Sequence, residues 1–383
     1  MSSVFITKAS YNDSLADLIH PILDKTIGNR VFPGARVLVK PNLLRPASPS
    51  QGILTHPLVV RAVVEWVLEK GGKVQVSDSP GIGPFRKILQ EGEYLDACRG
   101  LPIDWRPFTQ PKQVDIGPPF GHIDLAADVL ESDLVINLAK LKTHVMMRLT
   151  LGVKNMFGCV IGLEKTQWHL RAGIDRYFFA RLLVQICAAV NPAVTLIDGI
   201  LALEGQGPGI SGTPCPLGIL AAGTDPVALD FTVARMLGCS ANSLPVHQAA
   251  VRMGRFSGPP NIIGTLPPAI RVRLPELGSA GFGPPAAQKL MRRHLLRRPC
   301  VVATKCITCG ICEKQCPARA ITIQEGTVIF DYNRCIRCYC CVEVCPHGAL
   351  FTTEPTAGKM FRQLMVWVRP ALRRVGINPA NFP

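Results

Sequence analysis

The sequence predicts an α/β protein, in which a layered domain with a mostly parallel sheet precedes a small cysteine-rich α+β domain. Three observations lead to this fold class. Apolar strand-like runs and amphipathic helical stretches alternate through residues 4–250, as they do in domains with a parallel sheet. A stretch rich in glycine and proline follows at 255–287 and indicates a linker or a loosely draped connection. Two copies of one cysteine pattern then lie between residues 306 and 345.

Short apolar runs that end in polar or turn-forming residues predict the strands of the first domain, at 4–8, 36–40, 73–78, 133–137, 193–198 and 217–221. Helical spacing predicts the helices, at 13–27, 58–70 and 227–237. The second of these helices should begin beside Thr55 or His56, because Pro57 suits the first turn of a helix. Alternation of this kind is typical of βαβ units, whose strands pair in parallel.

Polar residues gather at the expected carboxyl ends of these strands, where open parallel sheets bind their ligands. Lysines at such ends could together bind a carboxylate or a phosphate, although each alone could be an ordinary surface lysine. The four lysines concerned are Lys40, Lys140, Lys142 and Lys154. We therefore predict an anion site, with the binding residues Lys40, Asn42, Lys154, Asp198 and Glu204.

Histidines and aspartates at element boundaries are candidates for catalysis. His56 and His144 each follow a threonine, and either could be an acid–base group, a metal ligand or a simple cap. Asp78 and Asp198 end apolar strands, so each could be a site carboxylate or a cap of the following loop. The predicted catalytic set is Lys142, His144, Asp78 and His56. The nucleotide-binding patterns G-x-x-x-x-G-K-[ST] and G-x-G-x-x-G are both absent from the sequence. A flavin could still bind, because flavin sites need no such pattern.

Two cysteine runs of the form C-x2-C-x2-C-x3-C-P repeat one pattern 29 positions apart. This spacing is typical of bacterial ferredoxins with two [4Fe-4S] clusters, in which the fourth cysteine of each run ligates the other cluster. The pattern predicts a first cluster bound by Cys306, Cys309, Cys312 and Cys345. It predicts a second cluster bound by Cys335, Cys338, Cys341 and Cys316.

Zinc is the alternative for paired C-x2-C runs, but tandem three-cysteine runs, each closed by Cys-Pro, favour iron–sulfur clusters. Disulfides are less expected, because nothing at the N-terminus resembles a secretory signal. Ala320-Ile321 and Ala349-Leu350 should pack over the clusters and limit solvent. Cys340 lies inside the second run without disturbing its spacing, and we interpret it as a small packing residue.

The composition limits the class of protein and its partners. The chain has 383 residues, of which 48% are hydrophobic and 18% charged, as in a globular protein. A net charge of +15 favours anionic partners. Nucleic-acid binding is not expected, because the basic residues are dispersed and only 6% of residues are aromatic. No run of about 18 apolar residues and no signal segment occurs, so the sequence predicts a cytoplasmic protein without a membrane-spanning helix.

The expected boundaries divide the chain into an α/β domain, a linker with a basic helix, a ferredoxin-like domain and a tail, at 1–254, 255–299, 300–356 and 357–383. The basic helix should cover 287–299. The tail is basic and amphipathic. It could dock as a helix on the domain surface, or it could attach the protein to an anionic membrane or to a partner subunit.

The motifs of the first domain together resemble the prokaryotic family called domain of unknown function 362. They are Lys40-Pro-Asn42-Leu, Thr55-His56-Pro57, Asp78-Ser79-Pro80-Gly81, Lys140-Leu-Lys142-Thr-His144, Gly152-Val-Lys154-Asn155-Met-Phe-Gly158, and Asp198-Gly199 with Glu204-Gly-Gln-Gly-Pro208. The resemblance covers roughly residues 4–250, and the C-terminal part is similar to two-cluster ferredoxins, a fusion familiar in the family. It implies the architecture and the clusters, but no settled reaction.

Three functions are compatible with a cluster domain fused to a domain with polar strand ends. The favoured one is an iron–sulfur oxidoreductase, which passes electrons to or from an anionic substrate or a second cofactor in the α/β domain. The second is an electron carrier or docking subunit of a larger redox complex, whose basic surface meets an acidic partner. The third is a non-redox isomerase, lyase or binding protein with structural clusters.

Overall fold

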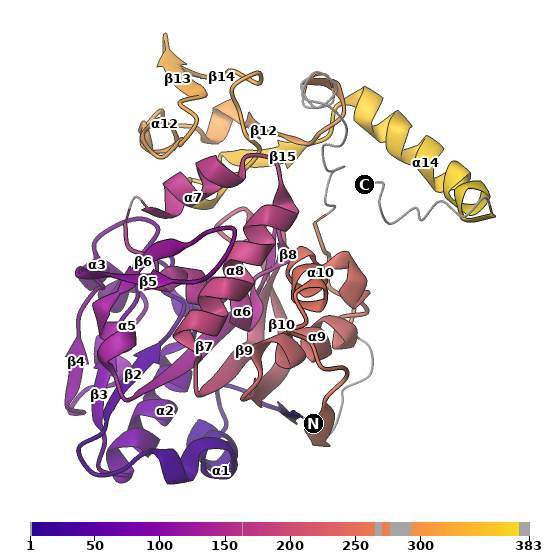
Figure 1. The fold of residues 1–383 in the computed structure, drawn as a ribbon. Coiled ribbons are helices and arrows are strands. Elements are labelled where there is room, and N and C mark those ends of the chain that lie inside the picture. The colour runs from indigo at the N-terminus through magenta and orange to yellow at the C-terminus, as the bar shows by residue number, and fades with distance from the viewer. Residues whose placement is uncertain (1, 163, 265–269, 276–289, 291–292, 375–383) are drawn as a thin grey trace.

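The computed structural model describes residues 2–162, 164–264, 270–275, 290 and 293–374, which Figure 1 shows as a ribbon. Their main sheet has nine strands in the order β11-β1-β10-β9-β7-β2-β3-β4, with β8 paired to β7. The strands are β1 (Ser3–Lys8), β2 (Arg36–Lys40), β3 (Lys73–Val76), β4 (Ile103–Trp105), β7 (Leu134–His144), β8 (Arg148–Leu149), β9 (Val194–Gly205), β10 (Gly212–Gly223) and β11 (Asn261–Gly264). Because β10 and β8 are antiparallel to their neighbours and the other pairs are parallel, the expected mostly parallel α/β class is confirmed.

Helices cover both faces of this sheet. They are α1 (Leu15–Ile27), α2 (Pro57–Glu69), α3 (Phe85–Glu91), α4 (Tyr94–Ala97), α5 (Ala127–Glu131), α6 (Leu151–Asn155), α7 (Glu164–Ala172), α8 (Arg176–Val190), α9 (Pro226–Met236) and α10 (Pro245–Arg252). Side chains of a strand alternate between its faces, so Val37 and Val39 join the core under α1 and α2. Leu38 joins the core under α8. A separate hairpin, β5 (Pro111–Asp115) and β6 (His122–Ala126), lies beside the sheet.

The cysteine-rich domain packs directly on the carboxyl ends of the strands. Its elements are β12 (Arg298–Val301), α12 (Ile311–Lys314), β13 (Ile321–Gln324), β14 (Thr327–Phe330), α13 (Cys340–Val344) and β15 (Leu350–Thr353), and α14 (Thr356–Arg374) follows them. Val342 and Cys345 belong to the same apolar cluster as α8. The buried Arg45 donates from Nη1 to the carbonyl oxygen of Cys345 at 2.9 Å. The two parts therefore share a core.

Three strands are longer than the sequence predicts. β7 continues from Asn137 through His144, β9 continues to Gly205, and β10 begins at Gly212. Asn137 looks like a strand end, but its buried amide donates to the Gly152 carbonyl at 3.0 Å and to Thr195 Oγ1 at 3.1 Å. Polar groups satisfied in this way can stay inside a strand.

The expected linker is only partly described. Within it, β11 pairs in parallel with β1 and adds an edge strand to the main sheet. Of the basic helix expected at 287–299, positions 287–289 and 291–292 lie outside the described residues, whereas Leu290, Arg293 and His294 are helical. Its last two positions, Arg298 and Pro299, belong to strand β12. Among the described residues, no helix has both the length and the apolar character needed to cross a bilayer.

A substitution at Gly207 tests how closely the connection between β9 and β10 approaches the backbone of β7. A Cβ atom on this residue would overlap the carbonyl oxygen of Thr143, which is fixed in the strand backbone. We expect Gly207→Ala to destabilise the protein by about 1–3 kcal/mol, as overpacking typically does, measured by anaerobic guanidinium denaturation. The control is Gly28→Ala, whose Cβ would meet nothing closer than 3.5 Å; equal stability of the two variants would contradict the packing.

Candidate functional site

A cavity of about 420 Å³ lies between the carboxyl ends of the strands and the cysteine-rich domain, within the size range of small-molecule sites. Its sheet side is formed by residues that end or follow β2 and β3, together with the α6–α7 segment. Its opposite side comes from the second cysteine run and its neighbours. Its polar and sulfur-bearing lining residues are Lys40, Asn42, Asp78, Ser79, Lys154, Asn155, Lys165, Thr166, His169, Gln315, Cys340 and Glu343.

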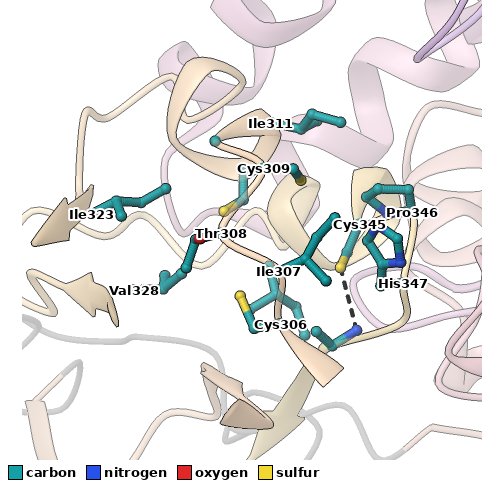
Figure 2. A pocket seen from close by; sticks show the side chains of 14 residues that line it. Cys306, Ile307, Thr308, Cys309, Ile311, Ile323, Val328, Cys345, Pro346 and His347 are labelled. Carbon is teal, nitrogen blue, oxygen red and sulfur yellow. Dashed lines mark hydrogen bonds between the residues drawn. The ribbon is translucent and has the colours of Figure 1, made fainter. Parts of the chain in front are cut away.

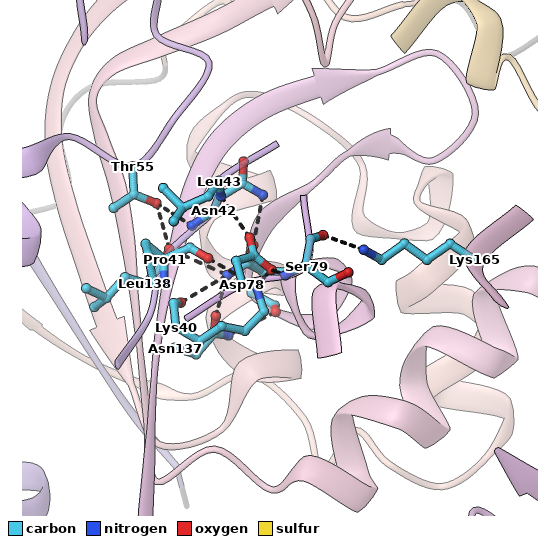
Figure 3. Close-up of polar contacts among 12 residues, drawn as sticks. Lys40, Pro41, Asn42, Leu43, Thr55, Asp78, Ser79, Asn137, Leu138 and Lys165 are labelled. Atoms are coloured by element: carbon cyan, nitrogen blue, oxygen red, sulfur yellow. Dashed lines mark hydrogen bonds and ion pairs between the residues drawn. The ribbon is translucent and has the colours of Figure 1, made fainter. Parts of the chain in front are cut away.

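Lys40 and Asp78 form a closed ion pair at one edge of this cavity, which Figure 3 shows. Lys40 Nζ is 2.8 Å from Asp78 Oδ1, and both side chains are buried. Lys40 also donates to the Pro41 carbonyl at 3.0 Å, and Asp78 Oδ2 accepts from the Leu43 backbone N–H at 2.8 Å. A Cβ on Gly158 would lie 2.6 Å from Lys40 Nζ. The pair therefore needs a glycine beside it, and its charges already have partners.

Asn42 links the cavity to Lys142. Its Nδ2 donates to Asn155 Oδ1 at 2.9 Å, and its Oδ1 accepts from Lys142 Nζ at 2.7 Å. Lys142 also donates to the Ile53 carbonyl at 2.9 Å and is not among the residues that line the cavity. Burial, and then repulsion by Lys154, lower the pKa of Lys142 to about 7. This lysine supports Asn42 from behind the cavity wall.

Lys154 is the cation best placed to meet a ligand. It lines the cavity, and its side chain forms no hydrogen bond or ion pair within the part of the chain that the structure describes. Burial lowers its pKa, while Glu343 and Cys340 raise it. Lys165 lines the same cavity and donates to the carbonyl oxygen of Ser79. Burial lowers the pKa of Lys165 to about 8.

Glu343 of α13 brings a negative charge to the opposite side of the cavity. Its Oε1 is 2.9 Å from His144 Nε2. His144 Nδ1 accepts from the backbone N–H groups of Met146 and Met147 at 3.0 and 3.2 Å, so Nε2 carries the hydrogen. Burial lowers the pKa of His144 to about 4. Although burial alone would raise the pKa of Glu343, His144 and Lys154 lower it to about 2, which leaves a carboxylate facing a neutral imidazole.

Asp198 and His56 lie in a different polar cluster. Asp198 Oδ2 accepts from Lys140 Nζ at 2.7 Å and from the His56 backbone N–H at 2.9 Å. Its Oδ1 accepts from the Tyr11 hydroxyl at 2.8 Å. The rings of Tyr11 and His56 stack 3.6 Å apart, and His56 Nδ1 accepts from Leu58 N at the start of α2. Neither Asp198 nor His56 lines the cavity, so the structure does not bring them together with Asp78 and Lys154.

Glu204 also lies away from the cavity. Its Oε1 accepts from Arg273 Nε at 2.6 Å, and its Oε2 accepts from the Arg273 backbone N–H at 2.9 Å. The carboxylate therefore holds the described segment 270–275 against the end of β9. The glycines that follow Glu204 are needed for the close β9–β10 connection. A glycine-rich loop beside a carboxylate has the same sequence pattern as a ligand-binding loop, so the sequence alone did not distinguish the two.

Lys165, His169 and Glu343 line the cavity but were not predicted from the sequence. Lys165 and His169 are four residues apart on α7, so they lie on one helix face. That spacing was the only available signal. Glu343 lies two residues after Cys341, inside the cysteine pattern. That pattern predicts metal ligation by cysteine and gives no role to a glutamate.

The eight cysteines of the repeated pattern line two separate cavities. Figure 2 shows the first, lined by Cys306, Cys309, Cys312 and Cys345 with apolar neighbours such as Ile323 and Val328. The second is lined by Cys316, Cys335, Cys338 and Cys341. The fourth cysteine of each run thus lies with the other run. Backbone N–H groups of Ala320 and Ala349 donate to the sulfurs of Cys316 and Cys345 at 3.2 and 3.3 Å.

This donor set fits [4Fe-4S] clusters. Sulfur ligands in fours, apolar walls and N–H donors to sulfur are the features that hold and tune such clusters. Among the described residues, no three His, Cys, Asp or Glu side chains converge closely enough for a single metal ion.

Asp198→Asn tests whether the second polar cluster is a structural brace. The substitution removes the charge that Lys140 needs, and breaking a buried ion pair costs about 3–5 kcal/mol. We expect a loss of that size in anaerobic guanidinium denaturation, with iron content unchanged. The control is Asp96→Asn, whose side chain is 73% exposed and should change stability by less than about 0.5 kcal/mol. Equal effects of the two substitutions would contradict the brace.

Comparison with known proteins identifies the two parts of the chain. Residues 37–235 match the family described as "Domain of unknown function (DUF362)". Residues 305–349 match the "4Fe-4S dicluster domain". The chain is 40% identical over 241 residues to the "Thylakoid-associated protein sll1697" of Synechocystis sp. (strain ATCC 27184 / PCC 6803 / Kazusa), covering 63% of this chain and 74% of that protein.

A solved structure shows a more distant likeness. The lactate racemase apoprotein from Thermoanaerobacterium thermosaccharolyticum aligns with a TM-score of 0.41 and 11% identity, over 62% of this chain and 56% of that chain. A likeness of this size has no bearing on function. The family match spans about half of the chain and confirms the resemblance carried by its motifs. The protein therefore belongs to the DUF362 family and carries a C-terminal 4Fe-4S dicluster ferredoxin domain.

Proposed function

We propose that this protein is an iron–sulfur oxidoreductase, in which two [4Fe-4S] clusters exchange electrons with an anionic substrate, or with a second cofactor, in the cavity. The observation that carries the proposal is the position of Cys340. This residue lines both the main cavity and the second cysteine cavity. It lies between Cys338 and Cys341 on the ligand loop, so one side chain would separate the sulfur ligands from a molecule bound in the cavity.

The ligand sets follow from the two cysteine cavities. Bound at these thiolates, each cluster would supply one-electron transfer. The first set contains Cys309, which is exposed, and its neighbour Ile307 is 62% exposed. The second set contains the buried residues Cys338 and Cys341. We infer that the first centre meets an external redox partner and that the second serves the cavity.

Lys154 and Lys165 would hold the anionic group of the substrate. Lys154 lacks a partner within the described residues, and a carboxylate or phosphate would supply one through charge-assisted hydrogen bonds. Glu343 remains ionised across the cavity and would repel that group. The positive charge of the lysines and the negative charge of Glu343 would therefore orient the bound molecule, with its anionic end at the lysines and its other end near Cys340.

Lys165 would also serve proton transfer. Its pKa of about 8 lies close to neutral pH, and a group with such a pKa can both hold and release a proton there. A reduction or oxidation that involves two electrons commonly moves protons as well. Lys165 is thus proposed as the acid–base residue of the cavity. His144 is proposed as a positioning residue that fixes Glu343.

An electron-carrier function is the second candidate. The exposed edge of the first centre and the net charge of +15 favour an acidic protein partner. In that case the cavity would bind no reacting molecule, and activity would appear only in the partner. For either function we propose a cytoplasmic location; the Synechocystis relative is described as thylakoid-associated.

Iron content tests the ligand assignment. Cys309→Ser removes one ligand of the first set at an exposed position. It should lower iron from about eight to about four atoms per chain and leave the α/β domain folded by circular dichroism. The matched control is Cys340→Ser, which lies within the second run but is not assigned as a ligand and should keep full iron. Full iron in Cys309→Ser would refute the assignment, as would half-loading in Cys340→Ser.

Reoxidation kinetics test the cavity. The reduced protein is mixed anaerobically with the small-molecule fraction of a cell extract, and cluster absorbance is followed. Lys154→Met should slow reoxidation by about tenfold or more, because an ionic hydrogen bond to the substrate is lost. Reaction with ferricyanide should not change, since it needs no cavity. The control is Lys314→Met, which removes an exposed lysine on α12. If the wild type reacts only with a protein partner, the carrier function replaces this proposal.

A further inference from the structure

The C-terminal helix α14 extends away from the rest of the described chain, as Figure 1 shows in yellow. Its 19 residues run from Thr356 to Arg374. The first turn is packed, since a Cβ on Gly358 would overlap the carbonyl oxygen of Leu295. Beyond that turn, the helix carries large apolar side chains that are exposed. Among the described residues, only the first turn of α14 thus packs closely on the domain surface, and the choice between the two sequence-based alternatives for the tail stays a prediction.

Three exposed apolar residues share one face of α14. Met360 is 65% exposed, Leu364 is 58% exposed and Trp367 is 83% exposed. Their spacing of four and three residues places them one above the other on a helix. Trp367 is the most exposed large apolar side chain among the described residues. An exposed apolar stripe of this kind, beyond the packed first turn and judged on the described residues, marks a surface that meets something else.

The charge of the helix indicates what it meets. Its sequence contains five basic residues, Lys359, Arg362, Arg369, Arg373 and Arg374, and no acidic residue. Each basic residue near an anionic lipid surface contributes about 1 kcal/mol to binding. Tryptophan is favoured where water meets acyl chains. A basic helix with an apolar stripe and too little apolar length to span is the type that lies in the membrane interface.

We propose that α14 binds the surface of a bilayer that contains anionic lipids. The helix lies in the plane of the interface, with Met360, Leu364 and Trp367 in the acyl boundary, and the net positive charge of its sequence attracts it to the anionic headgroups. The inference does not depend on the proposed oxidoreductase function, because it concerns no residue of the cavity or of the cysteine centres.

Membrane binding would hold the cysteine centres close to the bilayer. Only Glu354 and Pro355 separate β15 from α14. Leu350 of β15 lines the first cysteine cavity, so the helix cannot move far from that centre without disturbing β15. The exposed edge around Cys309 would then face partners at or near the membrane surface.

Vesicle flotation of the full-length, iron-loaded protein tests the proposal. We expect it to float with vesicles of phosphatidylcholine and phosphatidylglycerol, to float poorly with phosphatidylcholine alone, and to be released by high salt. Brominated acyl chains should quench the part of the fluorescence that Trp367→Ser removes, because Trp66 and Trp168 are buried and Trp105 of β4 is only partly exposed. Trp367→Ser should weaken binding by roughly tenfold or more through lost apolar burial, with iron content and cluster absorbance unchanged.

The control is Phe32→Ser, which removes an apolar side chain of 56% exposure elsewhere on the chain and should bind as the wild type does. Failure of the wild type to float with anionic vesicles would overturn the proposal. Binding that is equal on neutral vesicles would do the same, as would equal loss in both variants. Self-association that Trp367→Ser abolishes, without vesicle binding, would assign the stripe to a second copy of the chain.

Discussion

The contact between α13 and the carboxyl ends of the strands is the constraint on which the other features depend. A carboxylate at a largely buried position must have compensating groups nearby. Glu343 has them in His144 from β7 and in the positive charge of Lys154. In the same short helix, Cys341 lines a cysteine cavity and Val342 enters the core under α8. One turn and a half of helix therefore joins the sheet, the cavity and the sulfur ligands.

The buried lysines differ in what they are used for. Lys40 and Lys140 are neutralised by Asp78 and Asp198 at 2.8 and 2.7 Å, and such pairs hold neighbouring strands together without attracting a ligand. Lys142 is held by uncharged oxygens behind Asn42. Lys154 alone of these four lacks a polar partner among the described residues. Lysines in similar motifs therefore have different uses: three are structural, and Lys154 is available to a ligand. Only the partners that each lysine has in the folded chain distinguish these uses.

The parts of the fold that depend on local spacing could be predicted from the sequence. The first three cysteines of each run lie close together because only two residues separate one from the next. The alternation of strands and helices follows from side-chain periodicity. Apart from Cys316 and Cys345, which the repeated pattern assigns to the opposite runs, partners far apart in the chain could not be predicted. Asn137 looks like the end of a strand until Gly152 and Thr195 satisfy its amide. Asp198 looks like a site residue until Lys140 and Tyr11 surround it. Glu343 is recognised as a site residue only once the fold places its carboxylate beside His144.

The position of α13 between cysteines would also make the cavity wall depend on the bound clusters. Its ends are bounded by sulfur ligands, Cys338 and Cys341 before and within it and Cys345 just after it. A chain that has not received its metal would lose the restraint on both sides of Glu343, and the far wall of the cavity would loosen with it. A chain without its clusters would then keep a folded sheet while one wall of the cavity lost its support, so the shape of the cavity would depend on cluster loading.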